Sequence, residues 1–562
     1  MKNLSGLIYF IVKKVAIDNA IVFISIYAQV VFCYNIFHYL VKTVLKRRGI
    51  RLEKTLRMLF GRIGFCGMLI TLQVIILILV IFMFQEYFVY FYAFCILLSF
   101  IVVMYLLNNR VNPAYKIAWI VPILLFPIFG GLFYLLFGSD QTKQKFLNEM
   151  QPINEKLKQS LNQTPEIIEE IQAIDKRAAN QSNYITNYAL CPIYNNTSSE
   201  YLTLGERKFE RLIEELKNAK HYIFLEYFII EEGHMWNTIL DILKEKVAEG
   251  VDVRVIYDDF GCLFLLPSDY SKQLEDMGIK CCVFNPFIPL LTIRMNNRDH
   301  RKICIIDGHT AFTGGINLAD EYINEIVKHG HWKDTALMIK GDAVWSFTVM
   351  FLTMWDYLRH TNEDYELYRP HIYQTEPIES DGFVQPFTDS PLDNESVGEN
   401  VYMNLINNAT DYVYITTPYL ILDNEMITAL SNASKRGVEV KVLTPHHGDK
   451  WYVHAVTRAN YGALIDSGVQ IYEYTPGFVH AKTFVVDDEY AVVGTINLDY
   501  RSLYLHYECG AWLYKTKSVL DVRDDYIETL KVSQQMTAED LHAIPLYNKI
   551  LYAFLRVFAP LM

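Results

Sequence analysis

Two copies of one motif, offset by 180 positions, constrain the fold of this 562-residue chain more than any other feature. Each copy has a His, a Lys two residues later, an Asp five residues after the Lys, and a downstream Gly and Asn. These positions are His300, Lys302, Asp307, Gly314 and Asn317 in the first copy, and His480, Lys482, Asp487, Gly494 and Asn497 in the second. A single spacing of this kind arises by chance, but a duplicated set with the same downstream residues indicates two related halves.

The residues inside each motif indicate β-strands. Apolar runs separate the Lys from the Asp in both copies, at 303–306 and 483–486. In an extended strand, residues at i and i+2 project from the same face. Each His and its Lys are therefore expected to point the same way.

The segment before each motif repeats an alternation of helix and strand. Helical and then apolar strand patterns occupy 209–220, 222–230 and 251–257 in the first copy, and 401–409, 412–420 and 438–444 in the second. Such alternation is typical of α/β proteins. We therefore predict an α/β fold with two halves, residues 201–375 and 376–535, each a mixed sheet flanked by helices, related by a pseudo-twofold axis.

The duplicated side chains predict a site for a phosphodiester. A neutral imidazole can attack phosphorus and form a covalent phosphohistidine, while a second imidazole protonates the leaving alkoxide and later deprotonates the acceptor. Two Lys ammonium groups and two Asn amides can hold the non-bridging oxygens. For the aspartates two interpretations stay open: they structure the site, or they hold a His through its second nitrogen. Because side chains supply the positive charge, no metal or other cofactor is expected.

The first 138 residues are far more apolar than the rest of the chain. Glu86 is the only charged residue across two adjacent runs, 64–84 and 87–107, each long enough to cross a bilayer as a helix. A third uncharged run, 117–137, contains two prolines and two adjacent glycines, so a kinked or re-entrant helix is an alternative to a span. We predict transmembrane helices within residues 63–138.

Residues 1–62 are predicted to form a basic N-terminal region at the membrane. Residues 20–41 are either a further span or an interfacial helix, and 42–62 carry eight basic residues, as expected on the cytoplasmic side beside anionic lipid. Nine scattered cysteines without a CxxC pair favour a reducing compartment. We expect a multi-pass protein of the cell membrane with its catalytic region on the cytoplasmic side, although three full spans after 42–62 would place that region outside.

Two further segments flank the repeat. Residues 139–200 are predicted to be a polar connector, and 536–562 an amphipathic C-terminal segment that either rests on the bilayer or packs against the catalytic halves. The net charge of −12 opposes broad binding to nucleic acid. The sequence pattern makes no prediction about the oligomeric state.

With these motifs the chain resembles the phospholipase D superfamily, and within it the bacterial cardiolipin synthases most closely. The resemblance covers roughly residues 110–562. Similar phrases are 314–322, 332–335, 417–419, 494–502 with Glu508, the membrane segment 112–138 and the C-terminal 556–561. Two features depart from the family. The chain before residue 110 is longer than the usual two-span anchor, and the 13-residue stretch 287–299 replaces the three residues 477–479 of the second copy, so this loop either enters lipid or packs on the surface.

The resemblance implies a reaction and roles for the motif residues. A phosphatidyl group would pass from one phosphatidylglycerol to another, giving cardiolipin and glycerol, with anionic membrane lipid as partner and no nucleic acid. His300 would be the nucleophile and His480 the acid/base. The implied catalytic residues are His300, Lys302, Asp307, His480, Lys482 and Asp487, and the implied substrate ligands include Asn317 and Asn497.

Two carboxylates are further candidates for the substrate site. Glu508 either supports His300 or is a structural partner, and Glu226 either contacts the second His or a headgroup hydroxyl or is a buried structural group. Three other functions remain as alternatives: a phospholipase D-type enzyme that hydrolyses or exchanges headgroups, a nuclease of the same superfamily, and a non-catalytic membrane scaffold.

Overall fold

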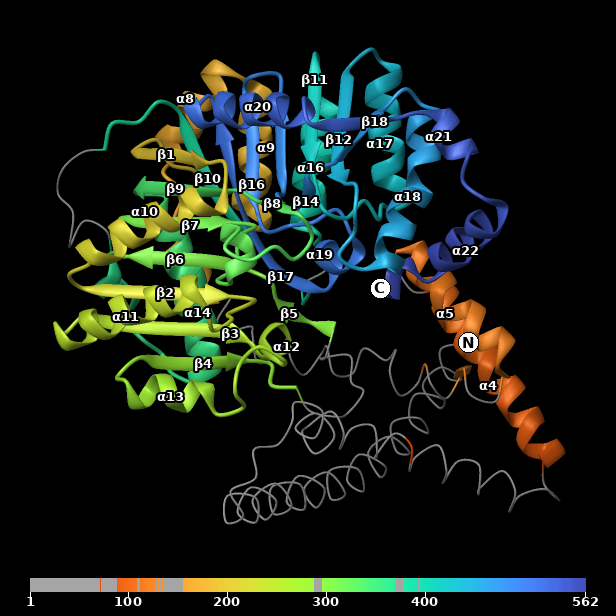
Figure 1. The fold of residues 1–562 in the computed structure, drawn as a ribbon, viewed down its shortest axis with the longest axis horizontal. Helices are drawn as coiled ribbons and strands as arrows, with labels where there is room; N and C mark the ends of the chain where they lie inside the picture. Colours follow the sequence, from red (N-terminus) through yellow and green to blue (C-terminus); the bar gives the residue numbers. More distant parts are fainter. Residues whose placement is uncertain are drawn as a thin grey trace. The chain divides into compact units, whose positions relative to one another are not determined.

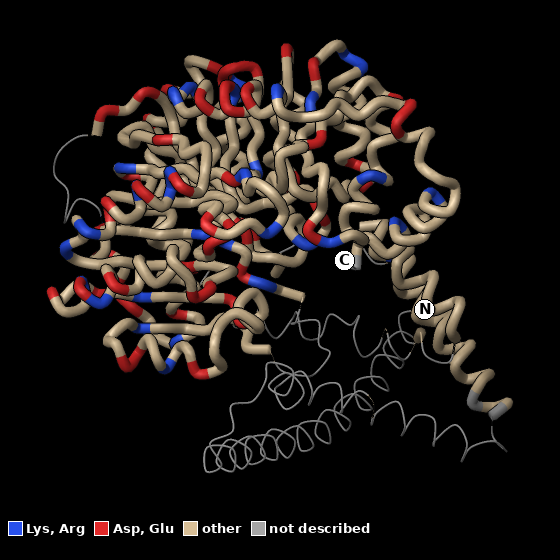
Figure 2. Tube along the Cα trace, in the orientation of Figure 1, with Lys and Arg blue, Asp and Glu red and all other residues tan. Residues whose placement is uncertain are grey.

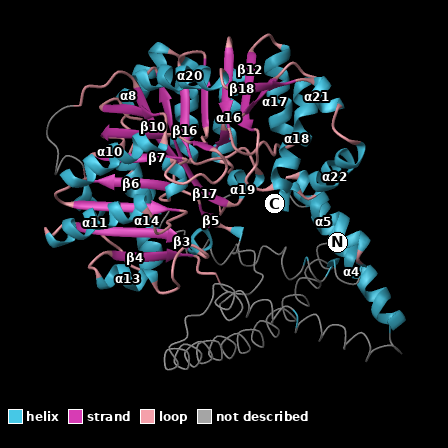
Figure 3. Ribbon diagram, viewed as in Figure 1, coloured by secondary structure: helices cyan, strands magenta, loops and turns pink. Residues whose placement is uncertain are grey.

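The computed structural model describes residues 88–108, 112–127, 155–287, 296–369, 378–392 and 395–561, together with residues 71, 130, 131 and 134. Within these ranges, the two repeated parts of the chain form two large mixed sheets with helices packed around them (Figures 1 and 3). The predicted α/β class is therefore confirmed for the part of the chain that the structure describes.

The first sheet has seven strands in the order β1-β9-β7-β6-β2-β3-β4. Their bounds are β1 Thr197–Leu202, β2 Tyr222–Tyr227, β3 Asp252–Asp258, β4 Lys280–Phe284, β6 Lys302–Ile306, β7 Thr310–Gly314 and β9 Ala336–Gly341. Strands β2, β3 and β4 are parallel, and the other neighbours pair antiparallel. The strands predicted at 222–230 and 251–257 are confirmed as β2 and β3. Strand β1 begins inside the segment predicted to be connector, because its backbone is needed to pair with β9.

The second sheet repeats this order and adds one edge strand. Its main path is β10-β17-β16-β15-β11-β12-β13-β18, so β10 to β13 match β1 to β4 strand for strand. The bounds are β10 Phe383–Asp389, β11 Tyr412–Thr416, β12 Glu439–Pro445, β13 Gln470–Tyr474, β15 Thr483–Val486, β16 Tyr490–Gly494, β17 His506–Tyr514 and β18 Ser533–Met536. Here too the three strands β11, β12 and β13 are parallel. The sequence repeat is thus a repeat of topology.

Short strands join the two halves beside the motifs. Strand β5 (Arg298–Asp299) of the first half pairs in parallel with the start of β17. Strand β14 (Gly477–Val479) of the second half pairs in parallel with β8 (His331–Lys333) of the first. Strands β5 and β14 each come directly before a motif His, so the backbone of each half positions the motif of the other.

Helices cover the two sheets, and some of them contact both halves (Figures 1 and 3). In the first half they are α10 Gly205–Asn218, α11 His234–Ala248, α12 Asp259–Cys262, α13 Tyr270–Asp276, η3 Asp320–Ile323, α14 Val344–Arg359 and η4 Tyr365–Tyr368. In the second half they are α16 Val397–Asn408, α17 Asn424–Lys435, α18 Trp451–Ile465, α19 Tyr500–Tyr504, α20 Lys517–Leu530, α21 Ala538–His542, α22 Leu546–Val557 and η5 Ala559–Leu561. Helix α14 contacts strands of the first sheet and β10, and α20 contacts β1 and strands of the second sheet. One apolar core runs through both halves as a result.

Before the first sheet lie α8 (Pro165–Ile174) and α9 (Lys176–Tyr188), which pack against each other in the predicted connector. Earlier still are α4 (Phe88–Asn108) and α5 (Pro113–Leu125). Helix α4 contains no charged residue, so Figure 2 draws it without blue or red segments. Helix α5 starts after an Asn112 N-cap and ends at Leu125, so the third apolar run breaks at Phe126, directly before Pro127.

No helix in the described ranges has both the length and the apolar content needed to cross a bilayer. The runs predicted at 20–41 and 64–84, apart from Thr71, lie outside the described residues, and so do the basic segment 42–62 and most of the long loop before the first motif. At the C-terminus, α22 contacts α18 and α5. The exposed side chains Leu546, Tyr547, Ile550 and Phe554 give α22 a second, apolar face that no described residue covers.

Candidate active site

The two motifs reach the same site through equivalent strands. His300 lies between β5 and β6, and Lys302 is the first residue of β6. His480 and Lys482 likewise precede β15, which occupies the matching place in the second sheet. The His300 amide donates to the Tyr507 carbonyl over 2.9 Å, and the His480 amide donates to the Lys333 carbonyl over 2.7 Å. Both bonds cross between the halves, so neither motif is positioned by its own half alone.

A carboxylate from the second half orients the His300 ring. His300 Nδ1 lies 2.9 and 3.0 Å from the two oxygens of Glu508, which is fully buried and also accepts a hydrogen bond from the Thr495 hydroxyl. Burial opposes the charged carboxylate, but its interaction with His300 holds the pKa of Glu508 below its usual range. Nδ1 is therefore assigned as the donor to Glu508, which leaves the lone pair of Nε2 free to attack.

A carboxylate from the first half orients the His480 ring in the same way. His480 Nδ1 lies 2.6 Å from Asp334 Oδ2, and Asp334 is fully buried. Burial opposes this charge too, but the interactions with His480 and Lys482 hold the pKa of Asp334 below its usual range. Each histidine is thus paired with a carboxylate of the opposite half.

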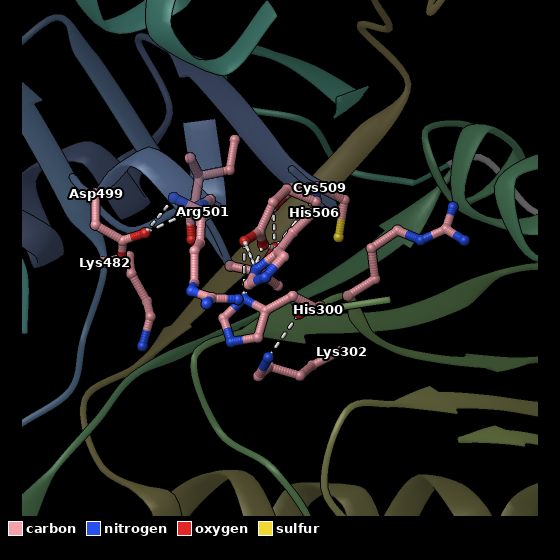
Figure 4. Close-up of polar contacts among 12 residues, drawn as sticks. His300, Lys302, Lys482, Asp499, Arg501, His506 and Cys509 are labelled. Carbon is pink, nitrogen blue, oxygen red and sulfur yellow. Dashed lines mark hydrogen bonds and ion pairs between the residues drawn. The ribbon is translucent and has the colours of Figure 1, made fainter. Parts of the chain in front are cut away.

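The two motif lysines are buried beside these rings. Lys302 Nζ donates to the His300 carbonyl over 2.6 Å, while Lys482 Nζ donates to the His480 carbonyl and lies 2.9 Å from His480 Nδ1. Burial lowers the pKa of Lys302 to about 8 and the pKa of Lys482 to about 7. The charge of Lys302 also lowers the pKa values of Lys482 and His480, so the motif groups of the two halves interact. Figure 4 shows the Lys302 amino group beside His300.

Both imidazoles are neutral at neutral pH in this environment. Burial lowers the pKa of His300 to about 3 and the pKa of His480 to about 4, against the opposing effects of Glu508 and Asp334. A neutral imidazole with a fixed Nδ1–H is a nucleophile through Nε2. Two such rings beside two lysines form a site suited to an anionic phosphorus ester.

Comparisons with known proteins show which family this chain belongs to. The family described as "Cardiolipin synthase, PLD-like domain" matches residues 212–354 and 402–530, and "Phospholipase_D-nuclease N-terminal" matches 97–139. A cardiolipin synthase of Alkalihalophilus pseudofirmus is 32% identical over 475 residues, 84% of this chain and 93% of that protein. A cardiolipin synthase 2 of Bacillus anthracis is 33% identical over 459 residues, 81% of this chain and 88% of that protein. This chain belongs to the cardiolipin synthase family of phospholipase D-like proteins.

Two more proteins are similar to this chain, one in sequence and one in fold. An uncharacterized protein of Streptococcus mutans is 46% identical over 461 residues, 82% of this chain and 99% of that protein. The crystal structure of phosphatidylserine synthase from Haemophilus influenzae has the same fold, with a TM-score of 0.52 at 17% identity over 68% of this chain and 98% of that one. The family model and the two cardiolipin synthases confirm the resemblance inferred from the motifs.

The motif aspartates of this family member do not hold the histidines. Asp307 accepts hydrogen bonds of 2.8, 2.8 and 2.9 Å from the backbone amides of Lys220, His221 and Tyr222, at the start of β2. Asp487 likewise accepts from the backbone at 410–412, at the start of β11. Each Asp lies five positions after its Lys, about 16 Å along an extended strand, so the aspartates lie at the far end of the strand from the imidazoles. Of the two interpretations left open by the sequence, these contacts favour the one in which the aspartates structure the site over the one in which they hold a His.

Asp307→Asn is therefore expected to affect stability more than catalysis. The amide would replace a carboxylate that satisfies three backbone donors, so we expect the free energy of unfolding to fall by about 1–3 kcal/mol. Denaturant unfolding followed by tryptophan fluorescence measures this change. A large fall in kcat without a fall in stability would contradict the structural role.

The two motif asparagines differ in their contacts. Asn317 is fully engaged, because its Oδ1 accepts from the Ile229 amide over 3.1 Å and its Nδ2 donates to the Tyr322 hydroxyl over 2.7 Å. Asn497 is buried as well, but its Oδ1 has no hydrogen-bond partner among the described residues. Asn497 is thus the better placed of the two to bind substrate.

Of the two candidate glutamates, Glu508 contacts a motif His and Glu226 does not. Glu226 on β2 is fully buried and forms an ion pair with Arg301, which also pairs with Asp299 over 3.1 Å. Burial raises the pKa of Glu226 well above its usual value, despite the opposing charge of Arg301. We therefore assign Glu226 to the support of β2 rather than to the substrate.

The motif pattern missed Asp334, the partner of His480. The repeat could have pointed to it: Gly315 corresponds to Thr495 by the 180-residue offset, and Asp334 then corresponds to Glu508. The amides of Gly315 and Thr495 bond to the matching carbonyls of Thr335 and Cys509. A Cβ on Gly315 would lie 2.1 Å from the Asp334 carboxylate, whereas Thr495 adds a donor to the longer Glu508. Each half uses a different pair of residues to place one carboxylate.

One group among the described side chains brings together three possible metal ligands: His300, His506 and Glu508. His300 and Glu508 already satisfy each other, and His506 Nδ1 lies 3.8 Å from Glu508 Oε1. In this group, the Glu508 carboxylate is thus a hydrogen-bond partner of the His300 imidazole.

Proposed function

We propose that this protein is a cardiolipin synthase that transfers a phosphatidyl group from one phosphatidylglycerol to another through a phosphohistidine. The observation that carries the proposal is the pair of buried imidazoles, each oriented by a carboxylate of the opposite half. Between equivalent strands, these rings and the two lysines supply a nucleophile, an acid/base and the positive charge that a phosphodiester needs.

The first half of the reaction forms the intermediate. Nε2 of His300 attacks the phosphorus of phosphatidylglycerol, the P–O bond to glycerol breaks, and a proton from His480 passes to the departing oxygen. An anionic phosphodiester beside His480 favours the protonated imidazole, which supplies this proton despite the low pKa of His480 in the empty site. Glu508 stabilises the positive charge that the phosphorylated His300 ring carries.

The second half of the reaction reverses these steps with a new alcohol. A hydroxyl of a second phosphatidylglycerol attacks phosphorus, its proton returns to His480, and the P–N bond to His300 breaks. The products are cardiolipin and a neutral His300. One glycerol has been released for each cardiolipin formed.

The exposed apolar surfaces support action at a lipid bilayer. Helix α22 presents Leu546, Tyr547, Ile550 and Phe554 to solvent, and α4 exposes most of its apolar side chains. We propose that the protein is bound to the cell membrane with its catalytic halves on the cytoplasmic side. The cysteines support that side, since all seven in the described residues are free thiols and buried.

The test is to incubate the purified full-length protein with vesicles of phosphatidylglycerol alone. We expect cardiolipin and an equal molar amount of glycerol. A His480→Ala variant serves as the control for contaminating activity. Phosphatidic acid as the main lipid product would instead identify a phospholipase D-type hydrolase.

A further inference from the structure

The internal repeat allows the surroundings of the two active-site histidines to be compared position by position. The 180-residue offset relates Tyr322 to Ser502 and Phe478 to Arg298. Strand register relates Trp332 to His506, because Trp332 pairs with Phe478 in β8–β14 while His506 pairs with Arg298 in β5–β17. Three positions around one histidine thus have three counterparts around the other.

Aromatic rings surround His480. The ring centroids of Trp332, Tyr322 and Phe478 lie 5.6, 5.7 and 5.9 Å from that of its imidazole. The three rings also touch one another, since Trp332 lies 4.9 Å from both Tyr322 and Phe478. All three are buried, and the Tyr322 hydroxyl is occupied by Asn317. These three rings therefore form an almost wholly apolar wall beside His480, in which the Trp332 indole N–H has no hydrogen-bond partner among the described residues.

Polar residues stand at the counterpart positions around His300. His506 replaces Trp332 at the same distance, 5.6 Å between ring centroids (Figure 4). Its Nδ1 lies 3.8 Å from Glu508 Oε1, and neither of its nitrogens makes a hydrogen bond among the described residues. Ser502 replaces Tyr322, and its buried hydroxyl is also unpaired there. Arg298 replaces Phe478 and faces Asp258 at 3.5 Å. Buried polar groups that make no hydrogen bond, here the Ser502 hydroxyl and the His506 nitrogens, bind water readily.

We propose that the aromatic wall of Trp332, Tyr322 and Phe478 makes this enzyme a transferase by keeping water away from His480, the histidine that activates the acceptor. The proposal rests on the proposed function, in which His480 takes the proton of the incoming hydroxyl. Water at this position would compete with the lipid alcohol for the phosphohistidine.

Hydrolysis of the phosphohistidine, the competing step, follows the same course as transfer, with water in place of the lipid alcohol. A water oxygen attacks phosphorus, the P–N bond to His300 breaks, and a proton of the water passes to His480, which yields phosphatidic acid in place of cardiolipin. A water needs two or more polar partners to be held in a buried site. Three aromatic rings offer it only one donor, so the alcohol of a second lipid meets less competition at His480 than it would beside His300.

The experiment measures the molar ratio of phosphatidic acid to cardiolipin made from phosphatidylglycerol vesicles by the full-length protein. Trp332→His and Tyr322→Ser place at His480 the residues that stand at the counterpart positions. Each is expected to raise this ratio about fivefold to tenfold, the effect of one hydrogen bond gained by a competing water. Because both products come from the same active molecules, the ratio does not depend on how much of a variant is folded.

Two matched controls separate polarity from loss of packing. Trp332→Leu removes the ring but stays apolar, so its ratio is expected to match the wild type. His506→Asn alters the other histidine's surroundings and is expected to change the rate without changing the ratio. Wild-type cardiolipin synthesis with unchanged ratios in Trp332→His and Tyr322→Ser would overturn this inference, whereas a wild type that makes no cardiolipin would overturn the proposed function itself.

Discussion

Replacing His300 with alanine is expected to lower cardiolipin formation at least about 10³-fold, because the substitution removes the proposed nucleophile while leaving the lipid-binding surfaces in place. Steady-state release of glycerol from phosphatidylglycerol vesicles measures the loss. The structure gives the reason for so large an effect: no other described imidazole has a carboxylate partner from the opposite half and an adjacent motif lysine, apart from His480.

The matched control for this prediction is His309→Ala. His309 follows Asp307 in the turn after β6, at the opposite end of the strand from His300. It is expected to keep most of the activity, since an imidazole is again removed but no reacting group is touched. Near wild-type activity in His300→Ala would rule out the proposed nucleophile.

Glu508→Gln is expected to lower kcat by about 10²–10⁴-fold with little change in KM. The carboxylate accepts the Nδ1 proton of His300 and so leaves the lone pair on Nε2. An amide in its place can present its NH2 group to Nδ1, which favours the tautomer whose Nε2 carries the proton and cannot attack. Because the pKa of Glu508 lies below its usual range, the wild-type carboxylate stays charged at every pH from 5 to 8, and a change of pH in that range should not imitate the variant.

Glu226→Gln provides the comparison for Glu508→Gln. Both glutamates are fully buried, but Glu226 faces Arg301 instead of an active-site histidine. We expect Glu226→Gln to reduce stability more than rate, as seen by thermal unfolding beside the activity assay. Equal losses of kcat in the two variants, at equal stability, would show that Glu508 acts only as a buried structural group.

Much of the fold was predictable because the two halves of the chain repeat one pattern and can be compared with each other. The offset of 180 positions located two equivalent strands, and the i, i+2 spacing placed each His and Lys on one face. The parallel strands β2 and β11 appeared as largely apolar runs because both faces of such strands are covered, whereas β3 and β12 appeared as alternating patterns.

The partners of the histidines were harder to predict, because they come from the opposite half. Asp334 reaches His480 only through the parallel pairing of β8 with β14, a contact between residues almost 150 positions apart. The loops before the two carboxylates differ in length, so Asp334 and Glu508 do not share the 180-residue offset of the motif. The role of Asp307 was obscured for a simpler reason: short spacing in sequence suggests proximity, but an extended strand carries the Asp about 16 Å from its Lys.

The proposed mechanism requires that His300 carry the phosphatidyl group covalently during each turnover. The direct measurement is to quench the full-length enzyme within its first turnover on phosphatidylglycerol and to map the modified peptide by mass spectrometry. We predict a phosphatidyl group on His300 in the wild type and none in His300→Ala. An adduct on His480, or cardiolipin formed in the first turnover with no covalent adduct on the enzyme, would contradict the account.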